Sequence, residues 1–104
     1  MEKEELYLKI GNSLDNTEQS QFFGKPCFKV NNKAFCSFFQ NCMVFKLKAG
    51  SEQHSDALSL DGSILFDPSG KNRPMKEWVQ VPYDYKNKWA DFALASKQNV
   101  EGIS

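Results

Sequence analysis

Hydrophobic and polar residues alternate with a period of two between residues 22 and 48, a stretch that holds most of the chain's phenylalanines. This period is typical of β-strands in an antiparallel meander. The three strands that it predicts lie at residues 27–30, 33–40 and 42–48. Asn31 and Asn32 tolerate the positive φ of a tight hairpin turn, and Asn41 predicts a second turn. The middle strand is apolar on both faces, so we expect it to be central and covered on its outer face as well.

The chain before this meander divides into a helical and a polar part. Residues 2–14 carry Leu6, Ile10 and Leu14 at helical spacing, with acidic residues in the first turn, where they oppose the positive end of the helix dipole. Residues 15–21 are polar throughout and predict a linker or the frayed end of that helix. Because Pro26 cannot donate a ladder hydrogen bond, the segment around it is expected to be an edge strand or a broken one.

After the meander, the pattern predicts two more helices and two more strands. Ser51 is a good N-cap for a short helix that ends near residue 59, and a last helix runs from about residue 84 or 87 to residue 100. Its apolar stripe consists of Tyr85, Trp89, Phe92, Ala93 and Ser96. Strands are predicted at residues 63–67 and 75–81, and residues 101–104 form a tail.

The predicted order is helix, three strands, helix, two strands, helix. Strands and helices do not alternate regularly, which disfavours a doubly wound parallel sheet. We therefore expect an α+β fold of two layers, in which helices cover one face of an antiparallel or mixed sheet of about five strands. With 104 residues, the chain is long enough for one domain, residues 1–104.

Charge and composition exclude few classes of function. The 13 basic and 13 acidic residues cancel, which argues against binding to DNA or membranes by bulk charge. The charged N-terminal stretch and the lack of a long apolar run predict neither a signal peptide nor a membrane anchor, so the expected location is the cytoplasm.

The residues that most often carry chemistry are sparse and scattered. Cys27, Cys36 and Cys42 show no metal-ligand spacing, and we expect them to be small apolar residues in the sheet of a reduced protein. His54, the one histidine, lies in a polar stretch and is expected to be solvated. We therefore predict no metal, no cofactor and no catalytic residue.

One run of residues suggests a family. Residues 73–82, RPMKEWVQVP, together with Phe22-Phe23-Gly24 and the hairpin FKVNNKAFCSFF, resemble the TfoX N-terminal domain-like family over nearly the whole chain. The resemblance implies a two-layer α+β domain of the secretion-chaperone-like kind, related in shape to the YjbR-like proteins, and no known catalytic residues. The family commonly has a basic residue and a methionine ahead of its Phe-Gly, and here those positions hold Ser20, Gln21 and Phe22.

The strand at residues 75–81 supplies the candidate interaction surface. If Met75, Glu77, Val79 and Val81 face the helices, Lys76, Trp78 and Gln80 lie on the outer face. Glu77 then needs a partner, such as Arg73 or a lysine, because a carboxylate on a buried face is costly when unpaired. If Trp78 is exposed, it is a candidate contact for a partner or a dimer; if a terminus or loop covers it, Trp78 is an ordinary packed residue. The surface that we predict comprises Phe38, Arg73, Lys76, Glu77 and Trp78, with Trp78→Ala weakening a dimer but leaving the fold intact.

Three functions are open at this point. The first is a non-enzymatic protein–protein interaction or regulatory module, acting on a protein partner or on itself as a homodimer. The alternative is a nucleic-acid-binding accessory protein that uses the meander's lysines, Lys25, Lys29, Lys33, Lys46 and Lys48. The third is an enzyme that uses Glu77, Arg73 and His54.

Overall fold

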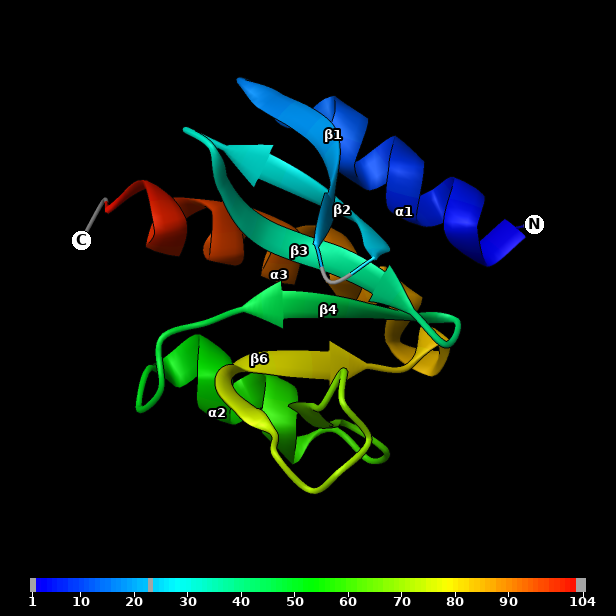
Figure 1. Ribbon diagram of the computed structural model, residues 1–104, viewed down its shortest axis with the longest axis vertical. Helices are drawn as coiled ribbons and strands as arrows, with labels where there is room; N and C mark the ends of the chain where they lie inside the picture. Colours follow the sequence, from blue (N-terminus) through cyan, green and yellow to red (C-terminus); the bar gives the residue numbers. More distant parts are fainter. Residues whose placement is uncertain (1, 23, 103–104) are drawn as a thin grey trace.

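An antiparallel sheet with the strand order β1-β2-β3-β4-β6-β5 forms the centre of the structure (Figure 1). The computed structural model describes residues 2–22 and 24–102. Within these residues the helices are α1 (Glu2–Ser13), α2 (Glu52–Ser59) and α3 (Lys86–Glu101), and a 3₁₀ turn, η1 (Tyr83–Tyr85), leads into α3. The strands are β1 (Thr17–Phe22), β2 (Lys25–Val30), β3 (Lys33–Phe39), β4 (Cys42–Lys46), β5 (Ile64–Phe66) and β6 (Met75–Val81).

The α+β fold predicted from the sequence is confirmed, with one strand more than expected. Residues 15–21, expected to be a linker, contribute most of β1, which pairs with β2 in an unbroken antiparallel register. The order is therefore helix, four strands, helix, two strands, helix. β1 escaped the sequence pattern because its residues TEQSQF have no apolar alternation. Pro26 pairs with Gln21 at one end of the β1–β2 ladder and lies in the second strand of the sheet.

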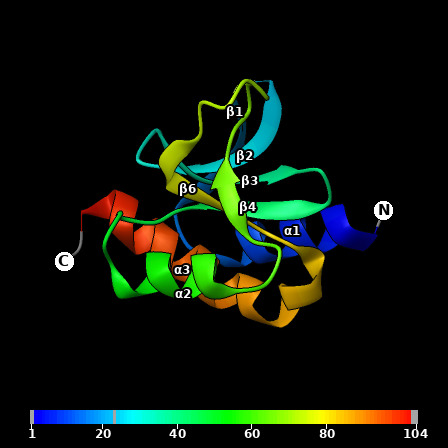
Figure 2. The ribbon, with the colours of Figure 1, turned by 90° about the horizontal axis from the view of Figure 1, so that it is seen from below.

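The three helices pack on one face of the sheet, which buries the main hydrophobic core (Figure 2). We call this side the helix face and the other side the outer face. The largest core residues on the helix face are Tyr7, Phe28, Phe35, Phe45, Leu47 and Trp89, each at most 1 % exposed. α3 lies over β3 and β4, and the Trp89 indole donates a hydrogen bond to the carbonyl of Pro82 at 3.2 Å. The predicted α3 stripe is confirmed in Trp89, Phe92, Ala93 and Ser96, all of which are buried.

A β-bulge in β3 decides which aromatic rings join this core. Phe28 pairs with Cys36 but the next residue of β2 pairs with Ala34, so Phe35 has no direct partner on β2. The extra residue lets Phe35 and Cys36 both face the helices, because a bulge interrupts the alternation of a strand. From the period-two pattern of residues 33–40 alone, we would place Phe35 on one face and Cys36 on the other, and the structure shows that this prediction is wrong.

A second cluster covers the outer face, as expected for a central strand that is apolar on both sides. Val44, Phe66 and Trp78 form its buried part, and Ala34, Phe39 and Met75 pack against them half-buried. Figure 2 shows the chain after β5 rising on the side of the sheet opposite to the helices. The sheet interior is therefore dry on both faces. In the described part of the chain, no helix is long and apolar enough to cross a membrane.

Helix α1 reaches the sheet at Gly11. A Cβ atom at this position would overlap the ring of Phe28, which is fully buried and has no room to turn away. On the same helix, the Tyr7 ring packs at a tilt against Phe28 and Phe38, with ring centroids 5.1 and 5.4 Å away. Burial raises the pKa of the Tyr7 phenol far above its usual value, so the ring stays neutral in the folded chain.

Gly11→Ala should destabilise the protein by about 2 kcal/mol, because forcing a methyl group into a packed core outweighs the gain in helix propensity. Urea unfolding followed by circular dichroism measures this loss. Asn12→Ala, at the next and exposed position of α1, is the matched control and should change the stability by less than about 0.5 kcal/mol. An unchanged stability of Gly11→Ala would show that α1 does not approach Phe28 so closely.

Candidate interaction surface

The predicted surface residues around the start of β6 differ strongly in exposure. Arg73 and Lys76 are exposed and Glu77 is half-buried. Trp78 lies on the outer face, as predicted, but it is only 5 % exposed. Of the two readings left open for it, ordinary packing is therefore the one that the structure supports.

Two residues lie on the other face from the one that we expected. Phe38 is half-buried on the helix face, against Tyr7, because the bulge at Phe35 reverses the alternation. Met75 was expected beside Val79 on the helix face but packs into the outer cluster, where the pairing between β5 and β6 shifts. Phe38, Arg73, Lys76 and Trp78 therefore do not form one exposed patch.

The loop between β5 and β6 is held by the carboxylate of Asp67. Asp67 accepts hydrogen bonds from the Ser69 hydroxyl at 2.7 Å and from the backbone N–H groups of Ser69, Gly70 and Arg73, each at 3.1 Å. These donors, the Ser69 hydroxyl first among them, lower the pKa of Asp67. The backbone of Arg73 is thus bonded to Asp67, while the residue as a whole is exposed.

Glu77 and His54 join β6 to the corner between β4 and α2. The Glu77 carboxylate accepts a hydrogen bond from the backbone N–H of Ala49 at 3.2 Å. Its partner is therefore a backbone group and not the arginine or lysine side chain that we expected. His54 Nε2 lies 2.7 Å from the carbonyl oxygen of Lys76, so the histidine is half-buried and bonded, and the prediction that it is solvated is wrong. Both contacts are structural ties.

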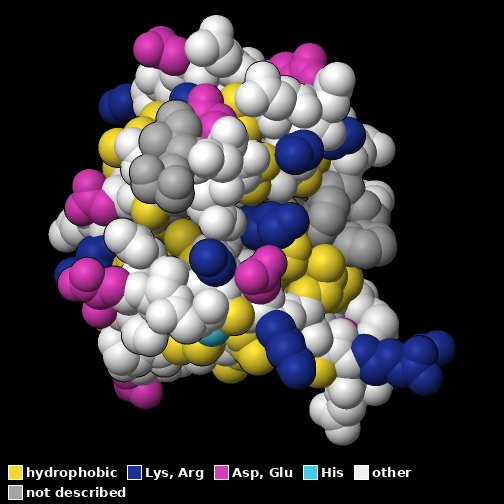
Figure 3. Space-filling model, turned by 90° about the vertical axis from the view of Figure 1, so that its left-hand side faces the viewer, with side chains coloured by type: hydrophobic (Ala, Val, Ile, Leu, Met, Phe, Trp, Pro, Cys, Tyr) yellow, Lys and Arg dark blue, Asp and Glu magenta, His cyan; other side chains and the backbone are white. Residues whose placement is uncertain are grey.

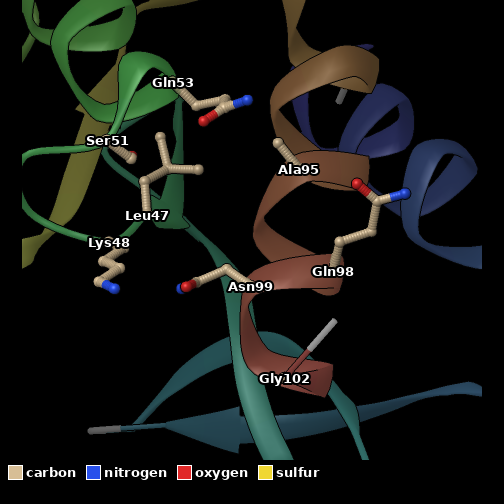
Figure 4. Close-up of a pocket in the computed structure, with 8 residues that line it drawn as sticks. All are labelled: Leu47, Lys48, Ser51, Gln53, Ala95, Gln98, Asn99 and Gly102. Carbon is tan, nitrogen blue, oxygen red and sulfur yellow. The ribbon is translucent and has the colours of Figure 1, made fainter. Parts of the chain in front are cut away.

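An open hollow of about 360 Å³ lies beside this corner, between the end of β4 and the helices α2 and α3 (Figure 4). In Figure 4 the Gln53 amide points across the gap toward Ala95, and Asn99 points from α3 toward β4. The Asn99 amide donates to the carbonyl of Lys46 at 3.1 Å. Lys48 is the one ionisable side chain among the eight residues that line this hollow, so the lining offers hydrogen bonds but no acid–base pair.

Lysines gather at the end of the sheet where β2 and β4 finish and β3 and β6 begin. This basic sheet end consists of Lys29, Lys33, Lys46, Lys48 and Lys76. Figure 3 looks at that side of the molecule and shows several Lys and Arg side chains spread over it. Lys25 belongs to the opposite end of the sheet, where its ammonium group lies 4.8 Å from the centre of the Phe39 ring.

The cysteines are free thiols, and Cys27 and Cys36 are buried while Cys42 is half-buried. Burial raises the pKa of all three, most strongly for the fully buried Cys36, so their reactive thiolate forms are disfavoured. The prediction that Cys27 and Cys36 serve as small apolar residues of the sheet is confirmed.

β1 is an open edge of the sheet that the sequence interpretation missed. It stands at one end of the strand order and contacts β2 and α1. The signals that frame it are two turns, at Asn16 with φ 63° and at Gly24 with φ 73°. Turn residues at both ends of a six-residue segment indicate a strand between them, and this signal could have predicted β1 without any apolar alternation.

The turn after β1 fixes which way its backbone points. Phe22 pairs with Lys25 across two residues, and the pair that closes such a turn exchanges backbone hydrogen bonds. Hydrogen-bonded pairs then alternate with non-bonded ones along the ladder. Glu18 and Ser20 accordingly direct their N–H and C=O groups toward β2. The residues whose backbone groups point to the open side are Thr17, Gln19 and Gln21.

The turn between β2 and β3 gives the same result independently. Val30 pairs with Lys33 across the Asn31-Asn32 turn, so the backbone of Val30 points to β3 and that of Lys29 to β1. Lys29 pairs with Glu18, which confirms that Glu18 bonds inward. Three residues on β1 therefore present free donors and acceptors outward.

Searches of protein-family models, curated proteins and solved structures found no match to this chain. The resemblance to the TfoX N-terminal domain-like family accordingly stays a prediction.

Trp78→Ala should cost about 3–5 kcal/mol of stability, because it empties the centre of the outer cluster. From the sequence we expected Trp78→Ala to leave the fold intact; the burial of Trp78 replaces that expectation with a loss of stability. Urea titration followed by the fluorescence of Trp89 measures the change. Ile64→Ala, at an outer-face residue that is 55 % exposed, is the control and should have little effect. Equal stability of both variants would show that Trp78 is not packed.

Proposed function

We propose that this chain is a non-enzymatic protein-interaction module that binds a β-strand of its partner along the edge of β1. The observation that carries the proposal is the open edge itself. A strand added there gains main-chain hydrogen bonds to Thr17, Gln19 and Gln21, which is how strand addition obtains its affinity. A regulatory role in the cytoplasm and the TfoX-like resemblance remain part of this proposal.

The two edges of the sheet differ in how well they are protected against strand addition. β5 has only three residues, its pairing with β6 shifts between Leu65 and Phe66, and Pro68 follows shortly after. Short strands, irregular pairing and proline all discourage the addition of another strand. β1 has six residues, no proline and no lysine, and its register with β2 is unbroken.

The side chains of β1 suit a polar, specific interface. Glu18, Gln19 and Gln21 are exposed, and Thr17 and Ser20 are half-buried. The one charge, on Glu18, lies directly opposite Lys29 on β2 and is therefore balanced within the chain. The Thr17 hydroxyl and one N–H of the Gln19 amide bond within the chain, so a partner strand meets the remaining amide groups of Gln19 and Gln21, which both donate and accept hydrogen bonds.

A photoreactive amino acid at position 19 should cross-link the partner in an extract of the protein's own cell. Gln21→Pro should abolish that cross-link, because the N–H of Gln21 points outward and its removal leaves the β1–β2 ladder intact. Gel mobility and mass spectrometry of the adduct provide the measurement.

The same probe at Gln98, an exposed position on α3, is the control and should give no matching adduct. An adduct at position 19 that survives Gln21→Pro would show that contact does not use the edge. No adduct at all would overturn the proposed function.

The basic sheet end supports a second candidate, the binding of nucleic acid. Five lysines lie at the same end, whereas Trp78, which pairs with Lys46 there, is buried. Without an exposed ring on which bases stack, this surface fits phosphate contacts alone.

If this candidate holds, affinity for a fluorescent single-stranded oligonucleotide should fall steeply with salt, with a slope of about −3.5 in log–log form for five phosphate contacts. Lys33→Glu/Lys48→Glu should abolish binding. Lys9→Glu/Lys88→Glu, with the same change in net charge on the exposed surface of α1 and α3, should weaken it far less. An equal loss of oligonucleotide affinity in both double variants would show that binding depends on the net charge of the protein and not on the basic sheet end.

A further inference from the structure

We infer that the strand received by β1 is β1 of a second copy of this chain, added antiparallel with Gln19 opposite Gln19. The inference rests on the proposed function, since it names the partner for the same edge. It follows from three properties of β1: the direction of its backbone groups, the face on which each side chain lies, and the position of its single charge.

Symmetry limits how two β1 strands can pair. A two-fold axis that joins them antiparallel is perpendicular to the sheet, so both copies keep their helices on the same side. Residues opposite each other must then share a face. Thr17 and Gln19 pair with Val30 and Phe28 of the helix-face core and therefore belong to the helix face, together with Gln21. Glu18 and Ser20 belong to the outer face.

Among the registers that obey this rule, one uses every outward group. With Gln19 opposite Gln19, Thr17 meets Gln21 at both ends, so all three outward residues of each copy are paired with outward residues of the other. A shift by one residue in either direction leaves one of the three without a partner. Because unpaired backbone groups are costly when a strand is covered, the central register is favoured.

Charge selects the same register. With Gln19 at the centre, Glu18 lies opposite Ser20, and no like charges face each other. In the register shifted toward the start of β1, Glu18 lies opposite Glu18, which is destabilising. One N–H of each Gln19 amide at the centre donates to Asn12 Oδ1 of its own copy at 3.4 Å, which leaves the amide oxygen and the second N–H to bond across the axis.

A charge swap at position 19 tests this inference on the intact protein. Sedimentation velocity should show that the wild type forms a dimer as its concentration rises. Gln19→Lys and Gln19→Glu should each weaken the dimer by about tenfold or more, because like charges then meet at the axis. An equimolar mixture of these two variants should restore a dimer, since lysine then faces glutamate.

Gln21→Lys is the matched control, because its new charge faces Thr17 of the other copy and never itself. It should weaken self-association less than Gln19→Lys does. Failure of the mixture to restore the dimer, or equal effects of the two lysine variants, would overturn the register.

Disulfide trapping supplies a second measurement of the register. In a Cys42→Ser background, Gln19→Cys should oxidise readily to a covalent dimer, because Cα atoms in a hydrogen-bonded antiparallel pair lie about 5.5 Å apart. Gln21→Cys should not, because its two copies lie four residues, roughly 13 Å, apart along the strands. Equal trapping at both positions would contradict the inference.

The failure of this inference and the failure of the proposed function have different signatures. Suppose that the wild type stays monomeric and that a probe at position 19 still cross-links a different protein, with the cross-link lost in Gln21→Pro. This result would overturn self-association and keep the β1 edge as the docking site. A monomer without any such adduct would overturn both.

Discussion

The burial of β3, β4 and β6 on both faces is the constraint on which the rest of the structure depends. Alternate residues of β4 face two different clusters: Phe45 packs under the helices, and Val44 packs with Trp78 on the outer side. Since each buried side chain of this size stabilises the fold by about 1.5–3 kcal/mol, neither cluster is dispensable in a chain of 104 residues. Phe66 at the end of β5 and Met75 at the start of β6 pack into the outer cluster, and the chain between them lies on that side of the sheet (Figure 2).

This two-sided burial also explains where the polar and charged groups lie. Lysines on the inner strands have no solvent-exposed position on either buried face, so they gather at the strand ends and form the basic sheet end. Glu77 and His54 were candidate catalytic residues in the sequence. In the structure they bind backbone groups of Ala49 and Lys76 and hold the corner between β4 and α2. The outer strand β1 is the exception, because it is polar on both faces and ends the sheet.

An open edge and a basic sheet end imply different partners. Strand addition to β1 depends on main-chain hydrogen bonds and changes little with salt, whereas phosphate binding by lysines is strongly salt-dependent. The two surfaces do not exclude each other, since the basic end lies across the ends of several strands and β1 offers its long side. Self-association through β1 would bring two basic ends into one particle, which links the two proposals through avidity.

The sequence by itself determined the fold class, the helices and the inner strands, because apolar residues at periods of two and 3.6 report directly on which side of an element is buried. It also determined that the central strand is covered on both faces. Only the tertiary structure decided the positions of Phe35, Phe38 and Met75, because a bulge and a shift in pairing arise between strands and leave no mark on either strand's pattern. Only the tertiary structure revealed β1, since a polar edge strand buries too little apolar surface to show a period and is fixed by its pairing with β2.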